Sequence, residues 1–435
     1  MTARYLAVKA LVRQEQNGFS NLVLDAELKK TVPPLAPRDA AFAASIFYTA
    51  LERQNTLDAR LAPFLKKPLA RLDSPVRAIL RAGLAQAAYM QVPLPAAVNE
   101  SVKLARAFGK TSAAGMVNAV LRRAAAHTLR EADYPDPVLR LSVLQNLSVP
   151  VAELLWRQYG AEAFALAAAF YDRRPTAVRV NTCKTTPDAL ADALRAEGCT
   201  VTPGGRANSL AVEFPASPAF TAAFRQGWFH VQGEASQLAA DSLCAAPGQR
   251  VLDLCAAPGG KSLTLAEAME NRGALLSCDA VPGRLPLLEK NFARCGITCA
   301  RVLQNDGAVF DPALGTFDRV LCDVPCSGLG VLGKKPDIRY RTAEGLSDLT
   351  DLQAKILQNA ARYLAPGGRL VYSTCTVNQA ENQEQIAQFL AKNKNFNVEA
   401  PQNPPPGAEV GPCGTLLLPN RTGLDGFFVA VLEKR

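Results

Sequence analysis

From about residue 235 onward, short apolar runs alternate with longer helical patterns, and this alternation limits the fold more than any other feature. Strands are expected over residues 250–254, 274–278, 300–303, 317–322 and 369–373, with helices starting at Lys261 and covering 283–295 and 346–364. Strands that alternate with helices form a parallel sheet with helices on both faces. A last strand at 427–432 is expected to run antiparallel. The sequence therefore predicts a doubly wound, Rossmann-like α/β domain over residues 233–435.

The preceding residues have other patterns. Within residues 1–132, apolar residues recur three and four positions apart, which predicts an all-helical domain with helices over 4–14, 39–53, 73–90, 96–108 and 113–125. Residues 140–232 combine helical patterns, over 149–158, 161–170 and 186–197, with a strand at 176–181, which predicts a small α+β connector. A multidomain chain fits the length of 435 residues, because single cores stop growing near about 250–300 residues.

Positive charge is concentrated in the helical region. Residues 1–130 contain 19 Lys and Arg against 8 Asp and Glu, whereas the rest of the chain sums to about −2 of the total +9. A localised basic surface is typical of a protein that binds a polyanion, here nucleic acid. The alternative is a set of solvated helix faces.

Composition argues against a membrane protein, a secreted protein and a metal-binding protein. No apolar stretch reaches the roughly 20 residues that span a bilayer, so no membrane partner is expected. The first residues lack a secretion signal, which predicts a cytoplasmic protein whose 11 cysteines are reduced. With no CxxC pair and only His127 and His230, no metal site is expected.

A turn rich in small residues follows the first strand of the α/β domain. Ala256, Ala257, Gly259 and Gly260 leave room for a ligand to approach the backbone. The GxGxxG dinucleotide fingerprint is absent, and a tight turn without a ligand is the alternative. The next two strands end at Asp279 and Asp306, which could bind the ribose hydroxyls and the amino group of an adenosine cofactor. Either residue alone could instead cap a helix.

Two cysteines follow strand ends on the same side of the predicted sheet. Cys326 lies in Asp323-Val-Pro-Cys-Ser-Gly328, and Cys375 lies in Ser373-Thr-Cys-Thr376. A thiolate that adds to carbon 6 of cytosine makes carbon 5 nucleophilic, provided that an acid meets the N3/N4 edge and a base removes the carbon 5 proton. Asp323 is the candidate acid. The alternative is that both cysteines are buried small apolar residues, the role expected for the other nine.

These motifs resemble those of the RNA cytosine-5 methyltransferase (Sun) family, and nearly the full chain is similar to its bacterial branch that acts on 16S ribosomal RNA. Further matches are Gln232–Gln237, Pro336–Ile338, Glu381-Asn382 and Asp425–Phe428. The N-terminal third resembles NusB-type RNA-binding domains through 78–83, 97–100 and 117–122. Val324 stands where the family more usually has alanine, and Gly333–Lys335 match loosely.

The resemblance implies a role for each matching residue. It makes Cys375 the nucleophile, and it makes Cys326 the cysteine that releases the product. Lys261 is our candidate for a positive charge near Cys375, and Arg179 and Asn181 match an RNA-facing segment. The residues implied to bind S-adenosylmethionine are Cys255, Ala256, Ala257, Pro258, Gly259, Gly260, Lys261, Asp279, Asp306 and Asp323. The implied partner is 16S ribosomal RNA or an early small-subunit assembly intermediate, bound by a monomer.

Four other functions stay open. One is cytosine-5 methylation of another RNA, such as a tRNA. A DNA cytosine-5 methyltransferase would use the cysteine of the Pro-Cys pair, Cys326, as nucleophile. A non-catalytic RNA-binding or antitermination factor would leave both strand-end cysteines unexplained, and a nicotinamide oxidoreductase would lack its GxGxxG turn.

Overall fold

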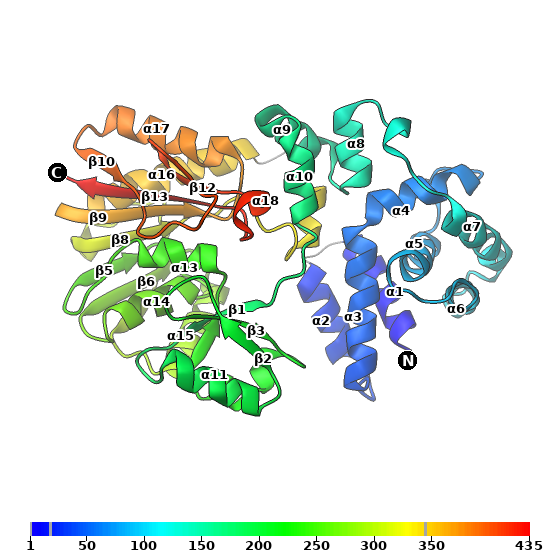
Figure 1. Cartoon of the computed structure of the whole chain (residues 1–435), viewed down its shortest axis with the longest axis horizontal. Helices are drawn as coiled ribbons and strands as arrows, with labels where there is room; N and C mark the ends of the chain where they lie inside the picture. Colours follow the sequence, from blue (N-terminus) through cyan, green and yellow to red (C-terminus); the bar gives the residue numbers. More distant parts are fainter. Residues whose placement is uncertain (1, 17–19, 343–345) are drawn as a thin grey trace. The chain divides into compact units, whose positions relative to one another are not determined.

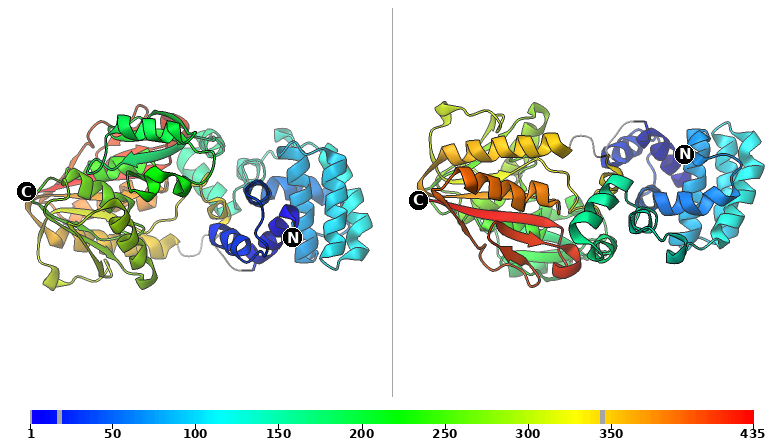
Figure 2. Two further views of the ribbon diagram at one scale, coloured as in Figure 1. Left: turned by 90° about the horizontal axis from the view of Figure 1, so that it is seen from below. Right: turned by 90° about the horizontal axis from the view of Figure 1, so that it is seen from above.

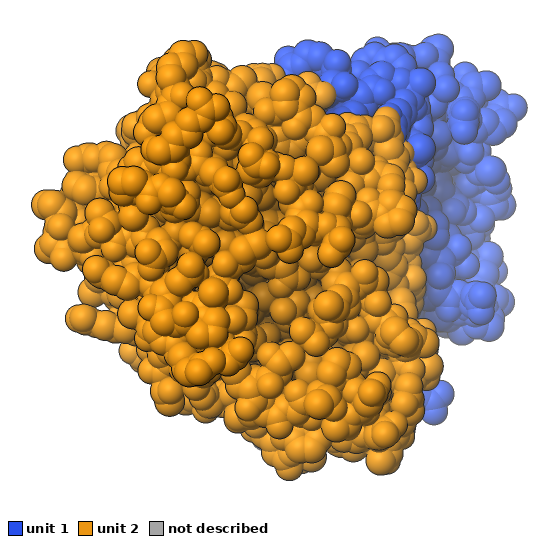
Figure 3. Space-filling view, turned by 60° about the vertical axis from the view of Figure 1, so that its left-hand side comes forward, with its two compact units in different colours: residues 1–168, 332–343 blue, residues 169–331, 344–435 orange. Residues whose placement is uncertain are grey.

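The computed structural model describes residues 2–16, 20–342 and 346–435, and the chain divides into two compact units. Unit 1 is Met1–Ala168 with Leu332–Ala343, and unit 2 is Ala169–Val331 with Glu344–Arg435 (Figures 1 and 3). The expected connector, 140–232, contributes helices to unit 1 and strands to unit 2. Domain boundaries at 132, 140 and 233 remain our proposal.

Unit 1 is helical, as predicted. Its described helices are α1 (Ala3–Gln14), α2 (Ser20–Lys29), α3 (Pro37–Glu52), α4 (Gln54–Leu61), α5 (Ser74–Tyr89), α6 (Leu94–Ala107), α7 (Ala114–Ala126), α8 (Pro137–Leu144), α9 (Val149–Tyr159) and α10 (Glu162–Ala169). Thr2 caps α1 by accepting the Tyr5 N–H, and Pro75 lies in the first turn of α5, where its missing N–H costs nothing. Fully buried Leu6, Phe47 and Ile79 belong to the core that α1, α3 and α5 share. Helices α2, α4 and α8 were not predicted.

The segment Leu332–Ala343 joins this helical unit although it follows the α/β strands in sequence. Ser20 donates a hydrogen bond to Asp337 over 2.5 Å, and the Tyr340 hydroxyl donates to the Leu51 carbonyl over 2.7 Å. Gly333–Lys335, which match the family only loosely, therefore lie in unit 1.

Unit 2 contains a small antiparallel sheet. Its strands are β1 (Thr176–Val180), β2 (Thr200–Pro203), β3 (Ser209–Glu213) and β4 (Phe229–Val231), in the order β2-β3-β1-β4, with helices α11 (Pro187–Ala196) and α12 (Ala222–Arg225). Val178, Val180, Leu190 and Phe229 are fully buried in its core. Only β1 and α11 were predicted.

The second sheet of unit 2 follows the predicted alternation. Its order is β11-β12-β13-β9-β8-β5-β6-β7, with β10 also paired to β13. Strands β5 to β9 run parallel to one another, and β13 runs antiparallel to β9, which confirms the predicted last strand. Helices α13, α14 and α15 cover one face, and α16 and α17 the other (Figures 1 and 2). The elements are β5 (Arg250–Asp253), β6 (Ala274–Asp279), β7 (Ala300–Gln304), β8 (Phe317–Asp323), β9 (Leu364–Thr374), β10 (Phe396–Glu399), β11 (Glu409–Gly411), β12 (Gly414–Leu417), β13 (Phe427–Lys434), α13 (Glu234–Asp241), α14 (Gly260–Ala268), α15 (Leu285–Cys295), α16 (Leu346–Tyr363), α17 (Gln383–Lys392) and α18 (Pro419–Thr422).

The register of the parallel strands brings their carboxyl ends to one edge. Asp279 at the end of β6 lies beside Gln304 at the end of β7, and Asp323 at the end of β8 lies beside Ser373 near the end of β9. Ligands of parallel sheets bind outside this edge. None of the described helices is long and apolar enough to cross a membrane.

Candidate active site

The small-residue turn connects β5 to α14. Gly259 has φ +108°, a backbone conformation that side chains disfavour, and a Cβ there would come within 3.0 Å of the Leu288 side chain. At Gly260 a Cβ would meet no atom closer than 3.9 Å, so space lies beside the start of α14. Glycine thus allows the tight bend, and the first N–H groups of α14 have no carbonyl partner within the helix.

Asp279 fastens this turn to the neighbouring strand. Its carboxylate accepts the Ala257 N–H over 3.2 Å and the Val281 N–H over 3.0 Å, and the Arg284 guanidinium lies 3.4 Å from one oxygen. The residue is only 4% exposed. Because a carboxylate has about four acceptor positions, Asp279 can hold the turn and still accept a ribose hydroxyl.

The third strand end presents a residue that sequence reasoning missed. Asp306 is exposed, and its side chain accepts the Ala308 N–H over 3.0 Å, as a cap would. Asn305 donates its N–H to the Asp279 carbonyl over 3.3 Å, and its side-chain oxygen is buried with no partner among the described residues. A buried polar atom without a partner is costly. In the sequence, only the position of Asn305 directly after β7 indicated that it could belong to the site.

The turn, Asp279 and Asn305 fit an adenosine-containing cofactor. The turn supplies backbone donors and free space, and Asp279 supplies acceptors. Asn305 supplies an unsatisfied oxygen that could accept a hydrogen bond from an amino group. Within the described ranges, no group of three or more His, Cys, Asp or Glu residues could hold a metal ion.

Two cysteines meet at the edge of β8 and β9. The Sγ atoms of Cys326 and Cys375 lie 3.2 Å apart, within hydrogen-bond distance, and both residues are partly exposed. The neighbouring sulfur of Cys375, together with burial and the carboxylates of Glu381 and Asp323, raises the pKa of the Cys326 thiol well above its usual range. Cys326 therefore keeps its proton and can donate it in a hydrogen bond to the Cys375 sulfur.

A charged pair lies at the end of β8. Lys261, in the first turn of α14, places its Nζ 2.8 Å from one Asp323 oxygen, and the Ser373 hydroxyl donates to the other over 2.7 Å. The Lys261 ammonium also lies 5.2 Å from the centre of the Phe427 ring. The positive charge that we expected near Cys375 is thus paired directly with Asp323, which lies three residues before Cys326.

The other cysteines differ in exposure. Cys199, Cys278, Cys295 and Cys322 are buried, as expected for small apolar residues, and Cys183 is exposed. Burial raises the pKa of Cys322 and of Cys255 well above the usual range. Cys255 can therefore contribute its backbone to the turn, and its thiol is a poor nucleophile.

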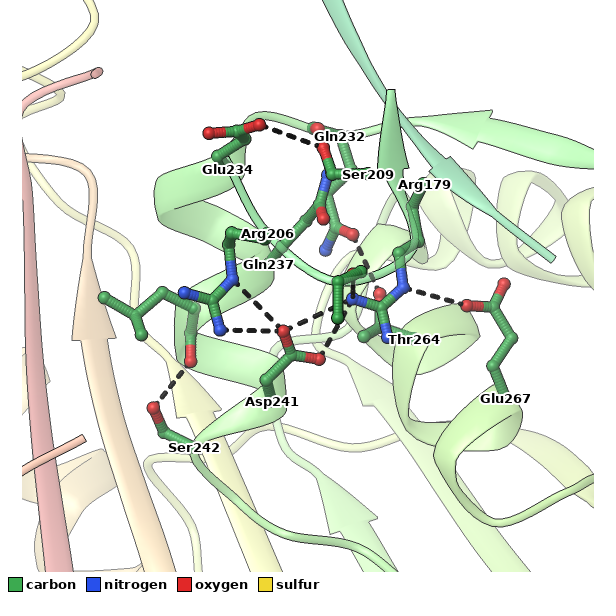
Figure 4. A network of polar contacts seen from close by, with 12 residues as sticks. Arg179, Arg206, Ser209, Gln232, Glu234, Gln237, Asp241, Ser242, Thr264 and Glu267 are labelled. Carbon is green, nitrogen blue, oxygen red and sulfur yellow. Dashed lines mark hydrogen bonds and ion pairs between the residues drawn. The ribbon is translucent and has the colours of Figure 1, made fainter. Parts of the chain in front are cut away.

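The two residues that match the RNA-facing segment have partners within the protein. Arg179 lies 3.1 Å from an Asp241 oxygen and 3.4 Å from a Glu267 oxygen, with its side chain only 7% exposed (Figure 4). Asn181 is fully buried and donates to the carbonyls of Gly227 and Cys295. Arg179 thus connects the small sheet to helices α13 and α14, Asn181 connects it to the end of α15, and both side chains are buried.

Comparisons with known proteins agree with this architecture. A family model described as "16S rRNA methyltransferase RsmB/F" matches residues 240–433, and one described as "NusB family" matches residues 1–126. The "Probable ribosomal RNA small subunit methyltransferase B" of Bacillus subtilis is 33% identical, covering 100% of this chain and 99% of that protein. The "Ribosomal RNA small subunit methyltransferase B" of Xylella fastidiosa is 34% identical, covering 99% and 97%.

Solved structures are similar as well. The crystal structure of PH0851 superposes with a TM-score of 0.84 and 25% identity, covering 100% of this chain and 99% of that chain. A methyltransferase homologue from Pyrococcus horikoshii covers 68% of this chain and 99% of its own, with a TM-score of 0.61 and 27% identity. On these similarities, which run from end to end, the chain belongs to the RsmB family of S-adenosylmethionine-dependent ribosomal RNA methyltransferases.

Proposed function

We propose that this protein methylates carbon 5 of a cytosine in 16S ribosomal RNA through a covalent bond between Cys375 and carbon 6 of the base. The observation that carries the proposal is the pair of thiols 3.2 Å apart, beside the Asp323 carboxylate at the carboxyl edge of the sheet. Relatives over the full length, named as small-subunit ribosomal RNA methyltransferases, support the choice of RNA.

Cys375 is the better nucleophile of the two cysteines. The raised pKa of Cys326 keeps that thiol protonated, so its S–H can stabilise negative charge on the Cys375 sulfur. A thiolate is the reactive form of cysteine. In the first step the Cys375 sulfur bonds to carbon 6, and the electron pair of the 5,6 double bond is delocalised toward N3, which takes up a proton.

Asp323 and Lys261 serve the N3/N4 edge of the base. Asp323 can accept a hydrogen bond from the N4 amino group, and the ammonium of Lys261 can supply the proton that N3 takes up. Ser373 fixes the other carboxylate oxygen, so the pair is oriented before substrate arrives.

Bound S-adenosylmethionine supplies an electrophilic methyl group to carbon 5. The turn at 255–261, Asp279 and Asn305 would hold it at the neighbouring strand ends. After transfer, the carbon 5 proton must leave and the bond between sulfur and carbon 6 must break. Cys326 is the residue that we assign to this release: it acts as the base once its own thiol proton has passed to solvent, or it aids a water molecule that takes the carbon 5 proton.

RNA affinity comes mainly from unit 1 in this proposal. Residues 1–130 contain 19 basic and 8 acidic residues. Three of the basic residues, Lys66, Lys67 and Arg71, are exposed and close in sequence, and we call them the exposed basic group. Phosphate contacts of this kind position an RNA without reading its sequence. The target cytosine must be unpaired or flipped out, because carbon 6 is shielded within a base stack.

Bisulfite sequencing tests the proposed product. Purified protein, S-adenosylmethionine and unmodified 16S ribosomal RNA should yield one cytosine that resists bisulfite, and Cys375→Ala should yield none. Methyl incorporation at a base position other than carbon 5, or equal activity on tRNA alone, would contradict the proposal.

A further inference from the structure

Two adjacent buried residues, Glu381 and Asn382, have so far no role in the reaction. They lie at the end of a short 3-10 helix (Gln379–Glu381) and just before α17, and both are 0% exposed. A carboxylate and an amide in such a place must be satisfied by specific partners. Their partners include the Ser327 N–H and the Thr376 carbonyl, which directly follow the two cysteines, and the Thr374 hydroxyl, which directly precedes Cys375.

Glu381 and Gln353 hold both sides of Cys326. The Ser327 N–H, on one side, donates to the Glu381 carboxylate over 2.8 Å. On the other side, the Pro325 carbonyl accepts a hydrogen bond from Gln353 Nε2 over 2.9 Å. The same Gln353 nitrogen donates to Glu381 over 2.9 Å. The buried side chains of Glu381 and Gln353 thus fix the backbone before and after Cys326.

Asn382 holds both sides of Cys375 in the same manner. Its Oδ1 accepts the Thr374 hydroxyl over 2.6 Å, and its Nδ2 donates to the Thr376 carbonyl over 3.0 Å. The carbonyl of Cys375 itself accepts the Gly330 N–H over 3.0 Å. Backbone freedom on both sides of the sulfur is therefore removed.

The two arrangements are joined by one further bond. The hydroxyls of Ser327 and Thr376, each directly after a cysteine, lie 2.7 Å apart and are both fully buried. The distance of 3.2 Å between the two sulfur atoms is thus imposed by the loops and needs no covalent link.

We propose that Glu381 and Asn382 are positioning residues with separate duties: Glu381 places Cys326 for product release, and Asn382 places Cys375 for attack on the base. The inference rests on the proposed function above. Each residue acts through one cysteine and touches neither RNA nor cofactor. The carboxylate of Glu381 also helps to keep Cys326 protonated until release.

Glu381→Gln tests the first duty. The amide nitrogen would replace either the oxygen that accepts from Ser327 and Gln353 or the oxygen that accepts from Asn378. In both orientations it faces a donor, so the placement of Ser327 is disturbed. We expect release to slow about tenfold or more, the scale of a misplaced catalytic group. Trapped protein–RNA adduct should therefore accumulate on denaturing gels while the single-turnover rate of adduct formation stays near that of the wild type.

Asn382→Asp tests the second duty in a Cys326→Ala background, where adducts accumulate and only their formation is measured. An aspartate still accepts from Thr374 but cannot donate to the Thr376 carbonyl. Adduct formation should slow by about tenfold to a hundredfold. In the same background Glu381→Gln should have no effect, because the cysteine through which it acts is gone.

The matched control is Gln385→Ala, which removes a buried hydrogen bond from Gln385 to the Thr350 carbonyl without touching either cysteine loop. It should match wild-type rates. If Glu381→Gln folds poorly, Gln353→Ala releases Pro325 and leaves the carboxylate in place, and it should also accumulate adduct.

Two results would overturn the inference. One is a Glu381→Gln effect that persists in the Cys326→Ala background, and the other is an Asn382→Asp variant that forms adduct at the normal rate. The proposed function itself fails separately, if Cys326→Ala traps no adduct at all.

Discussion

The carboxyl edge of the large sheet and the interior of the small sheet show what a sequence pattern can and cannot predict. At the edge, Asp279, Asp323 and Cys375 follow different strands, yet the parallel topology brings them together. In the small sheet, Arg179 and Asn181 match a family segment, yet both side chains are buried. A strand end projects into the ligand space by topology alone, whereas a residue within or beside an antiparallel strand depends on which face is covered.

The largest effect is expected at the edge. Cys375→Ala should abolish both methylated product and covalent adduct, because removing the nucleophile removes the reaction path. Binding of S-adenosylmethionine, measured by equilibrium dialysis, should stay within about twofold, since the thiol lies outside the turn after β5. Residual methylation at the wild-type rate would show that this strand end is not the reacting one.

Lys261→Met tests the charged pair at the same edge. Loss of the ammonium that faces Asp323 over 2.8 Å should lower the single-turnover rate by about 10² to 10⁴, the usual contribution of proton transfer. If both residues serve one step, Asp323→Asn should cost a similar factor and the double variant little more. Additive losses would mean that the two act independently.

Arg179→Met sharpens the contrast with the small sheet. The change leaves the buried carboxylate of Glu267 and the partly exposed carboxylate of Asp241 with one partner fewer, so stability should fall by about 3–5 kcal/mol in urea unfolding. The salt dependence of RNA binding should be unchanged at a temperature where the variant stays folded. A flatter salt dependence would return Arg179 to the RNA surface.

The exposed basic group in unit 1 should behave in the opposite way. Replacing Lys66, Lys67 and Arg71 with glutamine should leave stability within about 0.5 kcal/mol, as for most surface changes. RNA affinity should fall, and the slope of log K against log salt should decrease by about 1 for each lost phosphate contact. An unchanged slope would place the RNA elsewhere.

A smaller, pH-dependent effect on the free energy of unfolding is expected from Asp253, which directly precedes the turn after β5. Burial of Asp253 at the end of β5 raises its pKa to about 7, from the usual 3.8, against a hydrogen bond from Ser262. The folded chain thus keeps a proton that the unfolded chain releases at lower pH, so this contribution to stability is complete below pH 4 and is lost as the pH rises through 7. Asp253→Asn should flatten the stability profile between pH 5 and 8, measured by urea unfolding. An identical profile would show that Asp253 does not titrate there.

The sequence predicted the elements with strong periodicity and the residues at strand ends. It missed α4, which is short, and the strands β2 to β4, whose pairing depends on residues distant in sequence. It also missed contacts that only the fold creates. Lys261 and Asp323 are 62 residues apart, and no spacing rule predicts their pairing. Asn305 carries no motif, and its unsatisfied oxygen is visible only in the structure.

Locating the covalent adduct tests whether Cys375 is the nucleophile and Cys326 releases the product. Cys326→Ala is incubated with 16S ribosomal RNA and S-adenosylmethionine, the adduct is isolated under denaturing conditions, and nuclease and protease fragments are analysed by mass spectrometry. We expect a methylated cytidine attached to the peptide that contains Cys375, and no adduct in Cys375→Ala. A cytidine attached to Cys326 in the Cys375→Ala variant would contradict it and reverse the two roles.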